Sequence, residues 1–480
     1  MGDLHDLTAA EAARQIQCGR VTPTALLEAC LARIDACESA ICAWVQLDRE
    51  EAMHAAQERE REVGHGRSAG ALHGIPVAVK DIIDVAGMPT TAGAGPFAHR
   101  TPSADAASVT RLRAQGAVIP GKVTTTAFAF LDPAPTRNPW NVAHTPGGSS
   151  SGSAAAVAAR MVPLALGTQT IGSVLRPAAY CGIVGFKPSY GRISTAGVVP
   201  LSWSLDHVGI FSRSVEDAAL ALEVLAGSDA SGSRSSTALI DGYLSSLVDP
   251  PAPRIGIMRP LLEQTAPEMA EHLEAVVQLF RDRGASVTEV SLPPSFGNGA
   301  LTLWTATVAN ESELQPSHSR AFSGIHDAAR TVMQAEVATA HHELFAAHAD
   351  EFPPKIRQAI AGGQTIPAVA FLRAQEVRQR FRAEATALAV RYDALFTPTV
   401  GAPAPKGLES TGDPYFCAPW SAAGMPAIAI PSGLAEDGLP LSIQLVGAPF
   451  AEARLLAAAA WCERVLAFDH QPQVGTPATG

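Results

Sequence analysis

The sequence predicts an α/β protein in which a mostly parallel sheet is covered by helices. Short apolar runs bounded by glycine and proline alternate with longer helical patterns along much of the chain, which is typical of strand–helix units. Of the 480 residues, 47% are hydrophobic and 17% are charged, so a large buried core is available and general disorder is excluded. No internal repeat divides the chain, and one large domain over residues 1–480 is expected rather than two.

The N-terminal region, about residues 1–63, is expected to be mainly helical. Thr8 and Glu11 have the spacing of a capping box, and Thr22 before Pro23 is typical of a second helix start. A short strand is expected within residues 41–47, and a charged, alanine-rich helix should follow it.

Residues of about 70–227 are expected to form the catalytic core. The predicted elements are a strand at 75–79 that ends at Lys80, a helix at 103–115, a strand at 117–123, a loop at 138–152, a helix from 153, a strand at 164–166, a turn at 167–173 and a helix at 214–227.

A Ser-, Gly- and Pro-rich stretch at about 228–253 is the best candidate for a linker. Strands are expected at 254–258 and 287–292 around one helix, and about 301–390 should be a helical region that lines the substrate. The C-terminal part, about 391–467, should add strands at 394–396, 427–430 and 441–446 to the same sheet and then a helix.

Charge and composition exclude several classes of partner. Lys plus Arg number 35 against 46 acidic residues, a net charge of −11, and no basic block occurs, so neither nucleic acid nor an anionic membrane surface is expected as a partner. No stretch is long and apolar enough to span a membrane. Seven cysteines without a CxxC pair, and no N-terminal targeting pattern, favour a reduced, cytoplasmic protein.

Three polar features lie where a core-building sequence would not place them. Lys80 ends an apolar strand, residues 146–152 form a glycine–serine loop before a helix, and residues 167–173 form a second loop of small residues. The ordinary interpretation is that Lys80 is a surface lysine and that both loops are flexible turns. Consecutive main-chain N–H groups in such turns can also converge on one anion, as a developing oxyanion requires.

Simpler motif interpretations fail for these loops. Ser150 formally occupies a G-x-S-x-G elbow, but the proline-broken segment before it lacks the strand that the elbow needs. No Gly-Lys-Ser/Thr closes a phosphate-binding loop. A metal site at His341, His342 and His348 has no supporting motif, and a solvated helix face is expected there. Neither a metal nor another cofactor is predicted.

Long stretches of the chain resemble the amidase signature family. The resemblance is carried by residues 72–81, 147–173, 176–194 and 204–209 and by the late pieces at 424–427, 438–440 and 444–447, in the family's order. It implies one α/β/α domain with a mixed central sheet that helices cover on both faces. It also implies hydrolysis of an amide-type bond through a Ser–Ser–Lys triad.

Carried over position by position, the resemblance assigns three catalytic residues. Ser173 would be the acylated nucleophile, Ser149 the bridging serine after a cis peptide bond from Gly148, and Lys80 the base. Lysine accepts a proton only when neutral, so Lys80 should be sheltered from water. Strand alternation should send Asp81 to the opposite face.

The resemblance also assigns supporting groups. The main-chain amides of Thr170, Ile171, Gly172 and Ser173 would form the oxyanion hole, and Ser150 would support its loop by hydrogen bonds.

Three positions depart from the family's usual Gly-Thr-Asp-Thr-Gly-Gly-Ser-Ile-Arg. Gln169 replaces the acid, Ile171 replaces a glycine and Leu175 replaces the arginine, while Arg176 lies one place later. An acid and a base are lost together, so we expect a neutral arrangement where the family has a supporting ion pair.

The expected activity is therefore a cofactor-free serine hydrolase that acts on a small-molecule amide, carbamate or ester, with aryl amides included because the pocket is expected to be apolar. Phe128 and Ala129 are candidate lining residues, with the more ordinary alternative that both are core. The alternative function is a glutamine-hydrolysing subunit that delivers ammonia to a partner. A third interpretation, a binding protein without activity, disagrees with the presence of all three triad residues.

Overall fold

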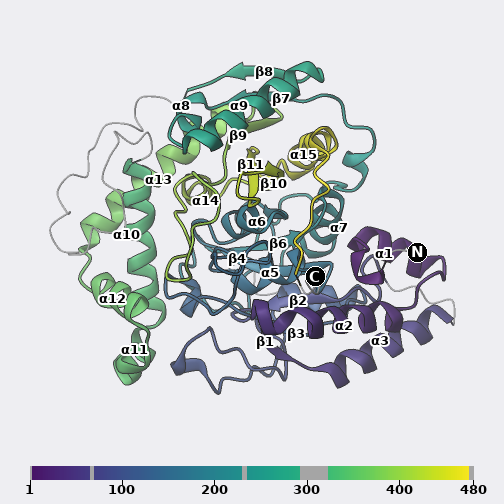
Figure 1. The fold of residues 1–480 in the computed structure, drawn as a ribbon. Helices are drawn as coiled ribbons and strands as arrows, with labels where there is room; N and C mark the ends of the chain where they lie inside the picture. The colour runs from purple at the N-terminus through teal and green to yellow at the C-terminus, as the bar shows by residue number, and fades with distance from the viewer. Residues whose placement is uncertain (1–2, 65–69, 230–234, 292–322, 475–480) are drawn as a thin grey trace.

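In a computed structural model of the chain, the described residues 3–64, 70–229, 235–291 and 323–474 form one layered α/β unit around an 11-stranded sheet (Figure 1). Its strands are β1 (Trp44–Leu47), β2 (Val77–Lys80), β3 (Gly121–Val123), β4 (Leu164–Gln169), β5 (Val184–Lys187), β6 (His207–Ser212), β7 (Arg254–Ile257), β8 (Ser286–Glu289), β9 (Ala394–Pro398), β10 (Ala427–Leu434) and β11 (Pro440–Val446).

Helices precede, follow and connect these strands. They are α1 (Ala9–Gln17), α2 (Pro23–Ile41), α3 (Arg49–Gly64), α4 (Ala107–Ala114), α5 (Ser151–Ala158), α6 (Leu175–Cys181), α7 (Val215–Leu225), α8 (Arg259–Leu262), α9 (Pro267–Asp282), α10 (Ser323–Ala340), α11 (His342–His348), α12 (Pro354–Gly363), α13 (Ala368–Ala389), α14 (Ala418–Ala422) and α15 (Glu452–Leu466). Short 3₁₀ turns occur at η1 (Leu4–Asp6), η2 (Gly95–Phe97), η3 (Ala127–Ala129), η4 (Ser245–Leu247) and η7 (Ala349–Glu351).

The sheet is mixed, in the order β1-β3-β2-β4-β6-β5-β10-β11-β9-β7-β8. Parallel pairing is confined to β3-β2-β4 and to β9-β7-β8, and the other neighbours are antiparallel. The mixed sheet implied by the resemblance is confirmed, and the mostly parallel sheet predicted from alternation alone is wrong. Two strands missed in the sequence, β5 and β6, account for much of the difference because both pair only antiparallel.

Helices cover both faces of the sheet. Helices α5 and α6 pack on each other and on β2, β4, β5 and β10, while α7 and α15 form a second packed pair against β5, β6, β10 and β11. Helices α10, α12 and α13 pack together and lie to one side of the sheet, next to α14 (Figure 1). Residues 301–322 of the expected helical region lie outside the described residues, as does Leu292 of an expected strand.

The N-terminal capping signals are confirmed. Thr8 and Glu11 exchange hydrogen bonds at the start of α1, and Thr22 accepts from Ala25 N before α2. Helix α2 continues to Ile41, so the expected strand at 41–47 is shortened to β1.

Other element boundaries in the core differ from the prediction. Helix α4 begins at Ala107 rather than 103, and α5 begins at Ser151 rather than 153. Strand β4 extends to Gln169, so the first three residues of the expected turn at 167–173 are strand.

No helix among the described residues is both long and apolar enough to cross a bilayer. All seven cysteines are unpaired thiols.

Candidate active site

Lys80 ends β2 inside the protein, with no exposed side-chain surface. Its Nζ donates to Ser149 Oγ at 2.7 Å and to Thr168 Oγ1 at 2.9 Å, and it forms no ion pair with any described residue. Burial lowers the pKa of Lys80 well below its usual value, and the negative charge of Asp206 opposes this shift only in part. The amine therefore favours the neutral form that a general base requires.

Parallel strand pairing brings the two loops of the site together. Strand β4 pairs with β2 in parallel, with Val77 opposite Leu164 and Val79 opposite Leu166, so both strands end at the same edge. Beyond Lys80 on one strand and Gln169 on the other, the chain turns into loops, which is where open α/β sheets commonly bind ligands.

Ser149 lies in the loop before α5, and its peptide bond from Gly148 is cis. The next residue, Ser150, donates from Oγ to Thr168 O at 3.1 Å and accepts from Thr168 N at 3.2 Å. A Cβ on Gly167 would lie 2.7 Å from Ser150 Oγ, so this close approach of loop to strand requires glycine. The Ser150 side chain thus bonds both main-chain polar groups of Thr168 in β4 and holds the serine loop against that strand.

The loop between β4 and α6 carries Ser173 and four free N–H groups. The main-chain amides of Thr170, Ile171, Gly172 and Ser173 donate to no acceptor among the described residues. A Cβ on Gly172 would lie 2.7 Å from Pro414, which fixes glycine at this point of the loop. Unpaired consecutive amides in a buried loop are the arrangement expected of an anion-binding site.

Ser173 is buried and forms no hydrogen bond with Ser149. Its Oγ makes no hydrogen bond with any described residue, whereas the Lys80–Ser149 contact is complete. The structure therefore brings two of the three predicted catalytic groups into direct contact and places the third on the adjoining loop.

Gln169 occupies the position where the family pattern has an acid. Its Oε1 accepts from the amides of Val174 at 2.8 Å and Leu175 at 3.0 Å, and its Nε2 donates to Ser421 Oγ at 2.7 Å. The side chain thus caps the first turn of α6 and ties it to α14 without any charge.

Arg176 is likewise buried and joins separate segments. It donates to the carbonyls of Gly148 and Gly412, both at 2.6 Å, and to Thr411 Oγ1 at 3.0 Å. Gln169 and Arg176 therefore both form hydrogen bonds only to neutral groups among the described residues.

Asp206, just before β6, is the acid next to this site. Thr170 Oγ1 donates to its Oδ1 at 2.6 Å, and the amides of Leu201 and Ser202 donate to its Oδ2. Burial raises the pKa of Asp206 to about 6, although these hydrogen bonds work against the rise. Glu336 on α10 accepts from Ser202 Oγ at 2.6 Å, so a second buried acid bonds the same residue as Asp206.

Asp81, the neighbour of Lys80, does not face the same groups. It pairs with Lys122 Nζ at 3.1 Å and accepts from Thr91 N, while Lys80 contacts only hydroxyls. The separation expected from strand alternation is therefore present.

The Phe128 ring stacks on Phe352 with centroids 4.9 Å apart and meets the rings of Phe97 and His341, so it lies in an aromatic cluster. Phe128 and Ala129 stay candidate lining residues. One sequence-based expectation needs correction. His341 is buried, with Nε2 2.8 Å from Pro200 O, so the prediction of a solvated helix face is wrong at this position.

Thr168 and Asp206 were missed as parts of the site. Both lie within the stretches that resemble the family, but neither has a spacing that marks a role. Thr168 contacts Lys80 because β4 continues three residues past its predicted end, and Asp206 is brought in by the antiparallel pairing of β6 with β4.

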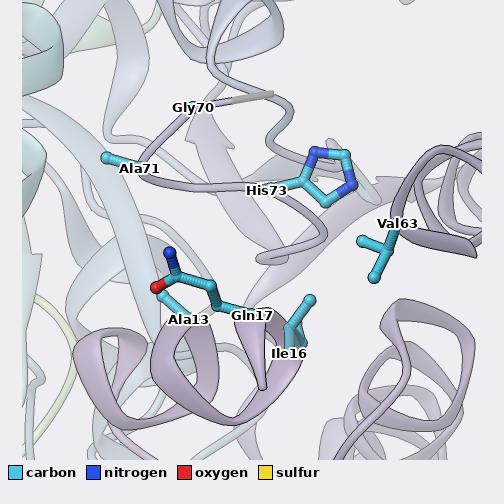
Figure 2. A pocket seen from close by; sticks show the side chains of 7 residues that line it. All are labelled: Ala13, Ile16, Gln17, Val63, Gly70, Ala71 and His73. Atoms are coloured by element: carbon cyan, nitrogen blue, oxygen red, sulfur yellow. The ribbon is translucent and has the colours of Figure 1, made fainter. Parts of the chain in front are cut away.

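A cavity of about 500 Å³ opens elsewhere, between α1, the end of α3 and the segment before β2 (Figure 2). Its lining is mostly apolar, and its histidine, His73, bonds to Arg59 O at 2.8 Å. The lining residues are Ala13, Ile16, Gln17, Val63, Gly70, Ala71 and His73. No Ser, Cys or Lys lines it, and its one histidine is bonded to a main-chain carbonyl, so the candidate active site is the cluster around Lys80.

Among the described residues, side chains close enough to share a metal ion occur at Asp3, just before η1, and at His5 and Asp6 within it. These belong to the N-terminal turn and not to the loops that carry the two serines. Exposed acidic groups of this kind are common on surfaces, and nothing at Lys80 offers a set of metal ligands.

Comparison with known proteins adds two findings. A family model described as Amidase matches residues 25–456. The A subunit of the glutamyl-tRNA(Gln) amidotransferase from Chloroflexus aurantiacus (strain ATCC 29366) is 36% identical over 476 residues, which cover 95% of this chain and 96% of the relative.

Solved structures with the same fold include amide hydrolases. The native peptide amidase from Stenotrophomonas maltophilia has a TM-score of 0.81 and 29% identity, covering 98% of this chain and 99% of that one. A 6-aminohexanoate cyclic dimer hydrolase has a TM-score of 0.84 and 25% identity, covering 99% and 100%.

Proposed function

The chain belongs to the amidase signature family, and on that premise we propose that it hydrolyses an amide-type bond through an acyl-enzyme on Ser173. The observation that carries this proposal is the state of Lys80. A fully buried amine, bonded to Ser149 Oγ at 2.7 Å and held without a carboxylate partner, is suited to accept a proton.

In the proposed acylation step, Ser173 Oγ attacks the substrate carbonyl carbon. The proton of Ser173 passes to Ser149 as the proton of Ser149 passes to Lys80, which becomes an ammonium ion. The oxyanion is bound by the free amides of residues 170–173. When the C–N bond breaks, the proton returns through Ser149 to the leaving nitrogen, and water then releases the acyl group by the same relay.

For the substrate, we propose a small neutral amide, with carbamates and esters as related acyl donors. The charged groups near the site are already used by the protein. Asp206 and Glu336 accept hydrogen bonds from the 201–204 segment, and Arg378 donates to Ser204 and to Ala422 O. This supports a pocket without free groups for the charges of an amino acid.

A second candidate is a glutamine-hydrolysing subunit that supplies ammonia to a partner. The curated relatives favour it over the neutral amide, since those found at 36–37% identity are A subunits of glutamyl-tRNA(Gln) amidotransferases. Both candidates share the acyl-enzyme chemistry and differ in the acyl group and in the need for a partner.

The test uses the purified full chain alone. Product release is measured from glutamine, from neutral primary amides and anilides, and from a carbamate, with Ser173→Ala as the inactive control. Turnover of neutral substrates at rates that Ser173→Ala abolishes would support the main proposal. Turnover of glutamine with little activity on the neutral set would favour the second candidate. Failure of a phosphonylating reagent to label Ser173 would contradict both.

A further inference from the structure

Arg176 connects the nucleophile loop to the bridging serine. It lies in the first turn of α6, three residues after Ser173, and its side chain is 3% exposed. One guanidinium nitrogen donates to both Gly148 O and Thr411 Oγ1, and the other donates to Gly412 O. Three separate stretches of chain therefore meet at one side chain.

No described acidic group lies within ion-pair distance of Arg176, although the charge of Asp413 opposes part of the effect of burial on its pKa. Arg176 forms no ion pair with a described residue, its Nε has no hydrogen-bond partner, and burial lowers its pKa. Burying a cation without a paired acid is unfavourable, and an apolar side chain of similar size would fill the same space at a lower cost in free energy. A gain in folding stability therefore does not explain why an arginine is present here, whereas its hydrogen bonds to separate segments do.

The two peptide groups that flank the Ser149 side chain are both held, the first by Arg176 and the second by Thr126. Gly148 O accepts from Arg176, and Ser149 O accepts from Thr126 N at 3.1 Å. With both carbonyls held, the Ser149 hydroxyl has little freedom to leave Lys80.

The same guanidinium anchors the chain that covers the nucleophile loop. Thr411 and Gly412 lie just before Pro414, which packs against Gly172 beside Ser173. A planar guanidinium can reach acceptors in several fixed directions, and a lysine ammonium on a single stem cannot reproduce this geometry.

We propose that Arg176 is a positioning residue that fixes the Gly148 carbonyl, and with it the Ser149 hydroxyl, relative to the loop that carries Ser173. The inference rests on the proposed acyl-enzyme chemistry and adds a group that never touches substrate. It also gives a physical role to the arginine that lies one place later than in the family pattern.

The experiment compares Arg176→Met and Arg176→Lys with the wild type in the full chain. A phosphonylating reagent gives both the fraction of chains labelled at Ser173 and the rate constant of labelling. For Arg176→Met we expect labelling of nearly every chain, with a rate constant and a kcat about 100-fold lower and a KM changed little, because a small misplacement of a catalytic group has an effect of this size. The labelling rate constant and the kcat of Arg176→Lys should lie between those of the wild type and those of Arg176→Met.

The matched control is Arg213→Met. Arg213 is another largely buried arginine whose pKa burial lowers, and it donates to the carbonyl of Leu7 in the N-terminal region and to that of Val162 before β4. This control should lose thermal stability but label at the wild-type rate. The pH dependence of labelling should keep the same midpoint in Arg176→Met.

Several results would overturn the inference. The first is a labelling rate in Arg176→Met equal to that of the wild type, and the second is a loss of activity explained wholly by a fraction of chains that do not label. The third is an equal fall in the labelling rate of Arg213→Met. The fourth is a shifted midpoint in the pH dependence of labelling of Arg176→Met, which would mean that Arg176 acts through its charge on Lys80. If Arg176→Met does not fold, the test rests on Arg176→Lys, which cannot reproduce the guanidinium contacts, and a wild-type labelling rate in that variant would equally reject the proposal. An unlabelled wild type would instead reject the proposed function itself.

Discussion

At the scale of single residues, the chemistry depends on how the protein surrounds Lys80. The sequence placed a lysine at the end of an apolar strand, where an exposed position was the ordinary interpretation. Its contacts with two hydroxyls and its complete burial come from β4 and from the serine loop, both distant along the chain. These features follow from tertiary packing and could not be derived from local pattern.

Asp206→Asn should move the pH dependence of kcat/KM toward lower pH. The Asp206 carboxylate raises the pKa of Lys80, so removing its charge lowers that pKa further and the base becomes neutral at a lower pH. Because the pKa of Asp206 is about 6, the wild-type carboxyl is mostly protonated below that value and the two enzymes should converge there. The measurement is the position of the rising limb of the pH profile, because asparagine has only one acceptor oxygen for the donors that bond Asp206, and the lost contact also changes the absolute rate.

The control for this prediction is Asp217→Asn. Asp217 is a second buried acid with a pKa raised by burial to about 6, and it lies on α7, where it accepts from Ala10 N of the N-terminal helix α1. That variant should keep the wild-type profile. A limb that stays in place or moves to higher pH in Asp206→Asn would show that Asp206 does not set the charge state of Lys80.

At the scale of elements, the helices were predicted better than the strands. Capping residues marked α1 and α2, because side-chain caps act within one turn. The short strands β5 and β6 carry no clear alternation and both faces are buried, so only their partners in the sheet define them. Asp206 was missed as part of the site for the same reason, because its position depends on β6, which was not predicted.

Gln169→Leu should destabilise the protein by about 2 kcal/mol, because it leaves the buried amides of Val174 and Leu175 without an acceptor. The loss should appear as a lower midpoint in urea unfolding, and the labelling rate of Ser173 should fall as the start of α6 loosens. Gln278→Leu, at an exposed glutamine bonded only to Asp282, is the control and should unfold close to the wild type. Equal stability of both variants would mean that the Gln169 cap contributes little.

At the scale of the whole molecule, residues on either side of the 228–253 stretch belong to one sheet. Strand β10 pairs with β5, with Ile428 opposite Phe186, and joins the C-terminal strands to the core that carries the serines. The buried Arg192–Glu452 pair, 3.1 Å apart, crosses the same boundary. A sequence can indicate one large domain from its length and its late strands, but the order of strands that closes it depends on long-range pairing.

A chain cut between Val248 and Asp249 should therefore remain assembled. Val248 is 80% exposed, and this point lies in a turn outside the sheet, so a protease recognition sequence inserted there should be accessible. After cleavage, the two fragments should co-elute in native gel filtration and still label at Ser173, because the β5–β10 pairing and the Arg192–Glu452 contact hold them together. The uncut insertion variant controls for the added residues, and urea should separate the fragments. Fragments that part in native buffer would show that the peptide connection, rather than the shared sheet, keeps the two parts of the molecule together.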